Sequence, residues 1–153
     1  MKRFQILFLL CLALSFTFSI FAQDTKEVII LQTSDVHSRI EPINQKGDKY
    51  YNKGGFVRRA AFLEQFRKDH KNVLLFDCGD ISQGTPYYNM FRGEVEIKLM
   101  NEMGYDAMTI GNHEFDFDVD NMARIFKMAD FPVVCANYNL DATAVSYTHL
   151  RAH

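Results

Sequence analysis

The sequence predicts an α/β fold in which mostly parallel strands are joined by crossover helices. Short apolar runs alternate along the chain with longer segments whose apolar residues recur at helical spacing. The short runs are apolar almost throughout, which is typical of buried strands in a parallel sheet. With 153 residues, 48% of them hydrophobic, the chain is long enough and apolar enough for one packed domain.

The first strand and helix are expected between residues 28 and 70. The apolar run 28–31 ends at the polar residues 33–35, so it is expected to form a buried strand. Residues 38–54 are rich in Asn, Gly, Lys and Tyr, which predicts a loop. A helix is then expected from the Gly54-Gly55 pair to about His70, with four apolar residues near one face: Phe56, Ala60, Leu63 and Phe66.

Further strands and helices follow by the same criteria. Strands are expected at 73–76, 107–110 and 132–136. Between the first two of these we expect a loop through Pro86 and then a helix over 94–103, which Gly104 stops. Between the last two, Asp118 is expected to cap a helix whose apolar side carries Val119, Met122, Ile125, Phe126 and Ala129.

The first 22 residues are expected to be a secretory signal peptide. Lys2 and Arg3 precede the unbroken apolar run 6–14, and Ala22 is a small residue suited to cleavage. A membrane anchor is the competing interpretation, but polar residues interrupt the second half of the segment, and a spanning helix needs about 20 mostly apolar residues. We therefore expect a secreted, periplasmic or cell-surface protein without a stable membrane span.

The last residues, 141–153, are expected to form an irregular tail, so the predicted domain covers 23–140. His149 and His153 stand four apart, but they follow no predicted strand. The string 145–153 resembles translated read-through of a sequencing adapter. We therefore interpret the tail as an artefact and expect the chain to be an inactive fragment of a longer protein.

Charge and cysteine content exclude two classes of function. Without residues 1–22 the chain keeps 15 Lys and Arg against 19 Asp and Glu, a formal charge of −4, which argues against binding a nucleic acid duplex. Cys78 and Cys135 lie in apolar runs with no Cys or His at zinc-finger spacing, so buried free thiols are expected.

Three polar clusters each follow a predicted strand, and they carry the functional prediction. These clusters are Asp35-x-His37, Gly79-Asp80 and the hexapeptide 111–116. In open α/β sheets, ligands bind outside the carboxyl ends of the strands, so the clusters are expected to converge. Asp35 and His37 are two apart and would share a face in an extended segment. Taken singly, these clusters could also be a surface pair, an ordinary Gly-Asp turn and a turn capped by Asn112.

The side chains in these clusters suit borderline divalent metal ions. Mixed oxygen and nitrogen ligands favour Mn, Fe, Zn, Co or Ni over calcium, which takes oxygen ligands. Asp80 has two carboxylate oxygens and could bridge two ions. A pair of ions about 4 Å apart would suit hydrolysis of a phosphate ester.

Together the clusters resemble, in order and spacing, the first three signature blocks of the calcineurin-like metallophosphoesterases. The longer strings 31–37, 79–85 and 111–116 resemble the 5'-nucleotidase branch of that family. The resemblance spans residues 27–140. It implies the N-terminal half of a four-layer α/β/β/α sandwich and hydrolysis of 5'-nucleotides to nucleosides and phosphate.

The resemblance also implies a role for each matching residue. Two divalent metal ions (Mn, Zn, Co, Fe or Mg) would be held by Asp35, His37, Asp80 and Asn112. His113 would contact the phosphate and stabilise the transition state or protonate the leaving group, and Asp116 would orient its imidazole. Asn112 would also face the substrate, and Glu114 would be structural.

Several functions stay open at the level of the sequence. Within the enzymes these are a 2',3'-cyclic-nucleotide phosphodiesterase and a UDP-sugar hydrolase. From another class comes a non-catalytic secreted binding protein with the same fold. The resemblance implies further histidine ligands, a Gly-His-x-His or Gly-His-x-Gln segment among them, and a separate or downstream nucleotide-recognition domain; residues 139–153 contain no such segment.

Overall fold

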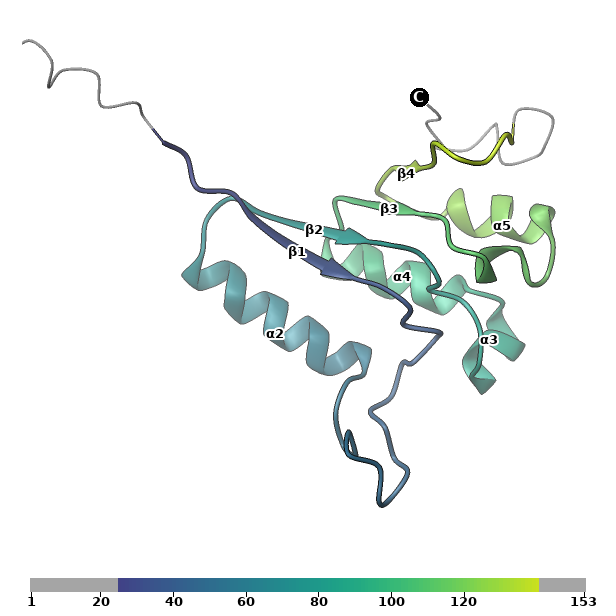
Figure 1. Ribbon diagram of the computed structural model, residues 1–153, viewed down its shortest axis with the longest axis horizontal. Helices are drawn as coiled ribbons and strands as arrows, with labels where there is room; N and C mark the ends of the chain where they lie inside the picture. Colours follow the sequence, from purple (N-terminus) through teal and green to yellow (C-terminus); the bar gives the residue numbers. More distant parts are fainter. Residues whose placement is uncertain (1–24, 141–153) are drawn as a thin grey trace, which may run out of the picture.

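A four-stranded parallel sheet forms the centre of the computed structural model, which describes residues 25–140. The predicted signal peptide and tail lie outside the described residues. The strands stand in the order of the sequence (Figure 1): β1 (Ile29–Thr33), β2 (Val73–Asp77), β3 (Ala107–Thr109) and β4 (Val133–Val134). Every neighbouring pair is parallel, with Ile29 opposite Val73 and Met108 opposite Val133. The predicted α/β fold and all four strands are confirmed, although β3 and β4 are shorter than expected.

The helices that cover the sheet lie on one of its faces (Figure 1): α2 (Phe56–Asp69), α4 (Glu94–Met103) and α5 (Val119–Phe126). Right-handed crossovers between strands that follow one another in order must all return on the same side of a sheet. Consistent with this, α4 contacts both α2 and α5. The other face is uncovered in the described part of the chain.

Because one face of the sheet is uncovered, the expectation that the strands are buried on both faces was wrong. Burial along β1 alternates, and Val28 and Ile30 are 53% and 62% exposed. The same alternation leaves Cys78 exposed beside the buried Asp77, so the prediction of a buried thiol was wrong for Cys78 and is confirmed for Cys135.

The core lies between the sheet and the helices. Leu75 and Met108 supply its sheet side, and the fully buried Ile97, Met122 and Phe126 supply its helix side. As predicted, Gly104 ends α4 in the left-handed conformation, at φ 65°. No helix within residues 25–140 has both the length and the apolar character needed to cross a membrane.

Two segments differ from the predicted loops. Residues 86–91 form a short helix, α3 (Pro86–Phe91), because proline suits the first helical turn, where its missing N–H costs nothing. A single 3-10 turn, η1 (His113–Phe115), occupies the hexapeptide. The predicted cap of α5 is confirmed, since the Asp118 carboxylate accepts a hydrogen bond from the Asn121 N–H at 2.6 Å.

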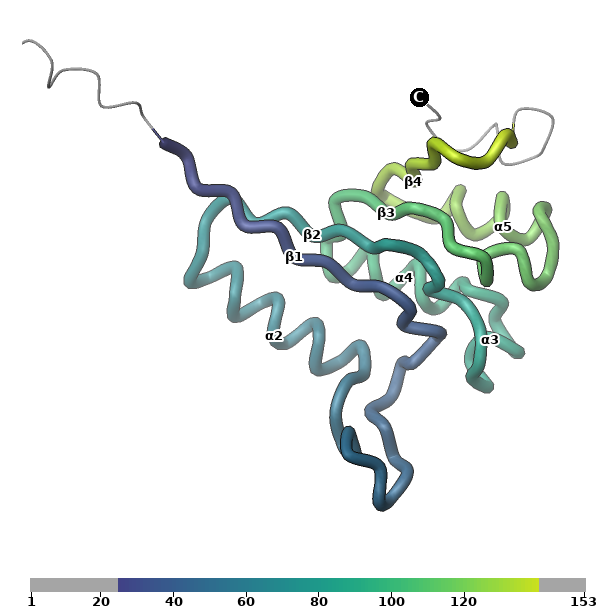
Figure 2. Tube along the Cα trace, in the orientation of Figure 1, coloured from purple at the N-terminus to yellow at the C-terminus, as the bar shows by residue number. Residues whose placement is uncertain are grey.

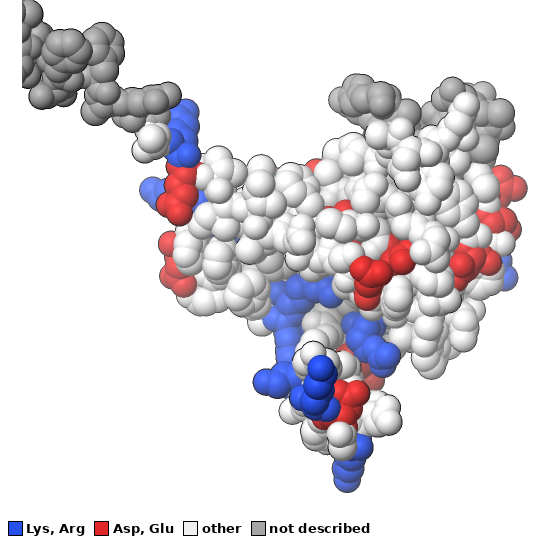
Figure 3. All heavy atoms as spheres, viewed as in Figure 1, with Lys and Arg blue, Asp and Glu red and all other residues white. Residues whose placement is uncertain are grey.

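The segment between β1 and α2 projects away from the sheet (Figure 2). Ile43 and Lys53 pair through the backbone, with the Ile43 N–H donating to the Lys53 carbonyl at 2.9 Å. Figure 3 shows Lys and Arg gathered on and beside this projection, whereas the visible surface over the strands carries few charges.

Candidate metal centre

The carboxyl ends of β1, β2 and β3 bring the three predicted clusters to one edge of the sheet. His37 follows β1, Asp80 follows β2, and His113 begins η1 after β3. Beyond the strands, the first two segments stay paired: the Asp35 N–H donates to the Gly79 carbonyl at 3.1 Å, and the His37 N–H to the Asp80 carbonyl at 3.0 Å. The parallel topology therefore places a carboxylate between two imidazoles.

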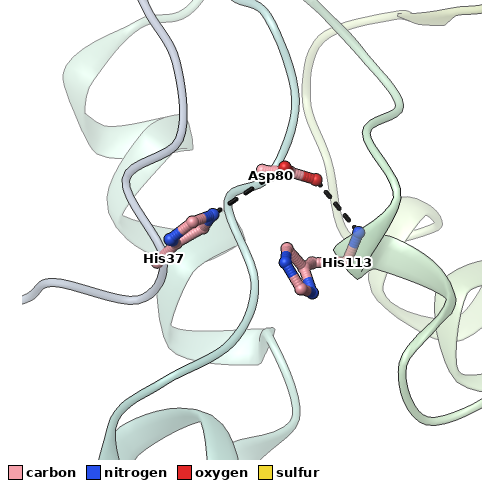
Figure 4. Close-up of side chains that lie close together, drawn as sticks. All are labelled: His37, Asp80 and His113. Atoms are coloured by element: carbon pink, nitrogen blue, oxygen red, sulfur yellow. Dashed lines mark hydrogen bonds and ion pairs between the residues drawn. The ribbon is translucent and has the colours of Figure 1, made fainter.

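Figure 4 shows the resulting group of side chains, His37, Asp80 and His113. His37 Nε2 lies 3.8 Å from Asp80 Oδ2, and the His37 and His113 rings meet edge to face with centroids 5.1 Å apart. One ligand atom from each of the three residues lies within 4.8 Å of the others. This spacing allows all three to reach a single ion.

His37 provides the observation that tests whether a metal fits. Its Nε2 is buried and has no hydrogen-bond partner among the described residues. A buried nitrogen without a partner is costly, because water is lost and nothing replaces it. An imidazole nitrogen beside a carboxylate oxygen is a pair of ligands that zinc and similar divalent ions take. The described residues therefore fit a divalent metal ion.

Two glycines allow the loops of the centre to touch through their backbones. A Cβ on Gly79 would lie 2.9 Å from Gly111 Cα, and a Cβ on Gly111 would lie 2.6 Å from Asp80 N. Real Cβ contacts are not this short, so both positions require glycine. Asp80 itself has φ 56°, a left-handed conformation that costs a residue with a Cβ about 1–2 kcal/mol.

Asp35, another predicted ligand, is not part of this group of His, Asp and Glu side chains among the described residues. The Asp35 side chain is exposed and accepts a hydrogen bond from the Ser34 hydroxyl. The segment is not extended as expected, because Asp35 and His37 have φ values of 53° and 43°. Asn112 is exposed just before η1. Metal binding by these two residues stays a prediction.

Asp116 holds the imidazole of His113. The His113 Nδ1 lies 2.9 Å from Asp116 Oδ2, and since a carboxylate only accepts, Nδ1 carries the hydrogen. This hydrogen bond raises the pKa of His113. Nε2 is left as the atom of His113 that is available to a ligand.

Two buried carboxylates support the centre: Asp77, to which sequence reasoning gave no role, and Glu114, which was expected to be structural. Asp77 accepts hydrogen bonds from the Thr33 hydroxyl at 2.5 Å and the Gly79 N–H at 2.9 Å, and burial raises its pKa to about 6. Glu114 is 2% exposed and accepts four backbone hydrogen bonds. Its place inside the hexapeptide was the only signal in the sequence.

The chain matches a known protein family. The family model of the calcineurin-like phosphoesterases matches residues 28–148. The chain belongs to the calcineurin-like phosphoesterases. The resemblance inferred from the three clusters is thus confirmed.

Among the relatives of this chain are several 5'-nucleotidases. The chain is 42% identical over 115 residues to a snake venom 5'-nucleotidase of Gloydius brevicauda and 40% identical over 116 residues to the human 5'-nucleotidase. Each match covers 72% of this chain and 20% of the relative. The chain therefore spans about a fifth of the length of these curated relatives.

Solved structures agree with the fold. The 5'-nucleotidase precursor of Thermus thermophilus superimposes with a TM-score of 0.64 at 37% identity, covering 72% of this chain and 22% of that one. The NAD nucleotidase of Haemophilus influenzae gives a TM-score of 0.64 at 35% identity, covering 72% and 20%. The parallel sheet with its helices therefore matches the corresponding part of these two structures.

Proposed function

We propose that the protein containing this chain is a metal-dependent phosphoesterase that hydrolyses 5'-nucleotides to nucleosides and phosphate. The observation that carries the proposal is the buried Nε2 of His37, which has no hydrogen-bond partner among the described residues and lies 3.8 Å from Asp80 Oδ2, beside His113 at the carboxyl edge of the sheet. Identities of about 40% to 5'-nucleotidases support the nucleotide as substrate.

Four residues would hold the divalent ions: Asp35, His37, Asp80 and Asn112. When bound, such ions supply positive charge that polarises a phosphoryl group and lowers the pKa of water to about 7. Asp80 is the natural bridging ligand, because it stands between the other two clusters and its carboxylate has a side-chain exposure of 13%. Mn, Zn, Co, Fe and Mg all remain candidates, and further ligands are expected from the rest of the protein.

His113 is proposed to act on the substrate and not as a ligand. Asp116 fixes the hydrogen on Nδ1, which leaves Nε2 for the substrate, and the raised pKa of His113 favours a second proton there. A protonated Nε2 can donate to a phosphoryl oxygen or deliver a proton to the leaving oxygen. Asn112, exposed next to it, is proposed to contact the same phosphate.

The proposal also covers the candidate substrates and the cellular location of the protein. The Haemophilus relative is a NAD nucleotidase, so NAD belongs beside AMP among the substrates to be tested, together with UDP-glucose and 2',3'-cyclic AMP. Secretion, to the periplasm or the cell surface, is proposed from the expected signal peptide over 1–22, and the venom relatives support it. A nucleotide-recognition domain elsewhere in the protein is part of the same proposal.

The test is phosphate release from AMP by the purified full-length protein, with and without Mn²⁺. Asp80→Asn should abolish metal-stimulated hydrolysis. Asp130→Asn is the matched control, because Asp130 is an exposed carboxylate just before β4, at the opposite edge of the sheet. Full activity of Asp80→Asn, or equal loss in both variants, would refute the bridging role.

A second variant separates the proposed roles of the histidines. His113→Ala should reduce turnover far more than metal content, whereas His37→Ala should reduce both. Metal content measured by mass spectrometry decides between them. Equal loss of metal and turnover in His113→Ala would make His113 a ligand.

A further inference from the structure

Glu114 accepts four hydrogen bonds in the metal centre, and all four come from backbone N–H groups. One of its oxygens accepts from the N–H groups of Ile81 at 2.9 Å and Ser82 at 3.3 Å. The other accepts from the N–H groups of Asp80 at 3.0 Å and Gly111 at 2.6 Å. The three consecutive donors come from the loop after β2, which lies more than thirty residues earlier in the chain.

These partners define the chemical state of the carboxylate. All four groups are donors, so both oxygens must accept, which an ionised carboxylate does and an amide cannot. Burial raises the pKa of Glu114, and the backbone donors act in the opposite direction. Successive N–H groups curved around an anion form a nest, the arrangement in which loops bind phosphate. Here the anion is part of the protein.

The Asp80 side chain also binds the backbone of the other loop. Its Oδ1 accepts from the His113 N–H at 3.0 Å, while its own N–H donates to Glu114. The loops after β2 and β3 are thus joined by a reciprocal pair of carboxylate-to-backbone bonds, with Gly79 and Gly111 in contact between them. In total, Glu114 accepts from the N–H groups of residues 80–82 and 111, and Asp80 accepts from the N–H group of residue 113.

We propose that Glu114 is a positioning residue that sets the Asp80 carboxylate in its metal-binding orientation before any ion arrives. The inference rests on the proposed metal site. The left-handed conformation of Asp80 is unfavourable by itself, and the hydrogen bonds from its loop to the charged Glu114 offset that cost. With Asp80 Oδ1 held by His113, Oδ2 remains directed at His37.

The variant that tests this is Glu114→Gln, titrated with Co²⁺ alone and followed by visible absorption. The amide keeps the shape of the side chain but turns an NH₂ group towards two backbone N–H groups. Groups that orient ligands typically change metal affinity by about 10- to 100-fold when altered, and we expect a loss in this range together with an altered Co²⁺ spectrum. Glu102→Gln is the control, because Glu102 is an exposed carboxylate near the end of α4, before β3 begins and so at the opposite edge of the sheet from the centre. It should keep wild-type affinity and spectrum; Glu114→Gln with unchanged affinity and spectrum would overturn the proposal.

A second measurement needs no variant and no metal. Hydrogen exchange of the wild-type, metal-free protein should show the amides of Asp80, Ile81, Ser82 and Gly111 protected by about 100-fold or more, as for stable native hydrogen bonds. The N–H of Gly84, with no acceptor among the described residues, is the internal reference for an open loop. Exchange of the four amides as fast as that of Gly84, with protection gained only after Co²⁺ is added, would overturn the idea of a preset carboxylate. Because this measurement requires neither metal binding nor hydrolysis, its result is separate from the test of the proposed function.

Discussion

Replacing Gly111 with alanine would place a methyl group inside the contact between the two loops of the metal centre. The new Cβ would lie 2.6 Å from Asp80 N and 2.7 Å from Asp80 Cγ. Because carbon atoms normally approach to about 3.5 Å, Asp80 must move by about 1 Å. Gly111 does not have a positive φ, so alanine suits its backbone and the whole effect comes from this steric overlap.

The magnitude follows from two contributions. Forcing an extra methyl into a packed site costs about 1–3 kcal/mol. Moving Asp80 also breaks its hydrogen bond with the His113 N–H, and a bond to a charged acceptor contributes about 1.5–3 kcal/mol. We therefore expect Gly111→Ala to lower the free energy of unfolding by about 2.5–6 kcal/mol and to weaken metal binding.

Urea unfolding followed by circular dichroism measures the first effect, and a Co²⁺ titration measures the second. Gly47→Ala is the control, because Gly47 has φ 92° and a Cβ there would meet nothing within 4 Å. It should lose only about 1–2 kcal/mol from its left-handed backbone and keep its metal affinity. If the free energy of unfolding of Gly111→Ala lies within about 0.5 kcal/mol of the wild-type value and its metal affinity is unchanged, the described contact between the loops is refuted.

Three further changes test other parts of the centre and the fold. Asp116→Asn should lower the pKa of His113, because the hydrogen bond from Asp116 is what raises it; an imidazole titration followed by NMR that shows no decrease would contradict the pairing. Asp77 has its pKa raised from 3.8 to about 6, so its contribution favours the fold below pH 3.8 and is lost as the pH rises through 6. Asp77→Asn should therefore remove a pH-dependent loss of about 2.4 kcal/mol in the free energy of unfolding, measured by urea between pH 4 and pH 7, and identical pH dependence in both proteins would disprove it. Asp118→Ala should destabilise the protein by about 1 kcal/mol through loss of the cap of α5, and an unchanged melting temperature would show that the cap is not needed.

Features set by neighbouring residues were predictable from the sequence. Asp118 caps α5 through an N–H three residues later, and Gly104 ends α4 because its left-handed conformation disfavours other residues. The convergence of the clusters was also predictable, since the carboxyl ends of parallel strands share one edge. His37, Asp80 and His113 do meet there.

Features set by the order of the strands were not predictable in the same way. The apolar run containing Ile30 suggests burial, but the order β1-β2-β3-β4 puts the helices on one face and leaves Ile30 exposed on the other. The turn at Asp35 depends on its bond to Gly79, a partner 44 residues away, so no local pattern could show that the segment is not extended. Glu114 likewise meets donors more than thirty residues distant.

We propose above that His37 and Asp80 hold a divalent metal ion at the edge of the sheet. A crystal structure of the full-length protein soaked in Mn²⁺, with anomalous scattering recorded at a wavelength suited to manganese, tests for this ion directly. We expect an anomalous peak bonded to His37 Nε2 and an Asp80 carboxylate oxygen. No peak at saturating Mn²⁺, or a peak bonded to neither residue, would contradict it.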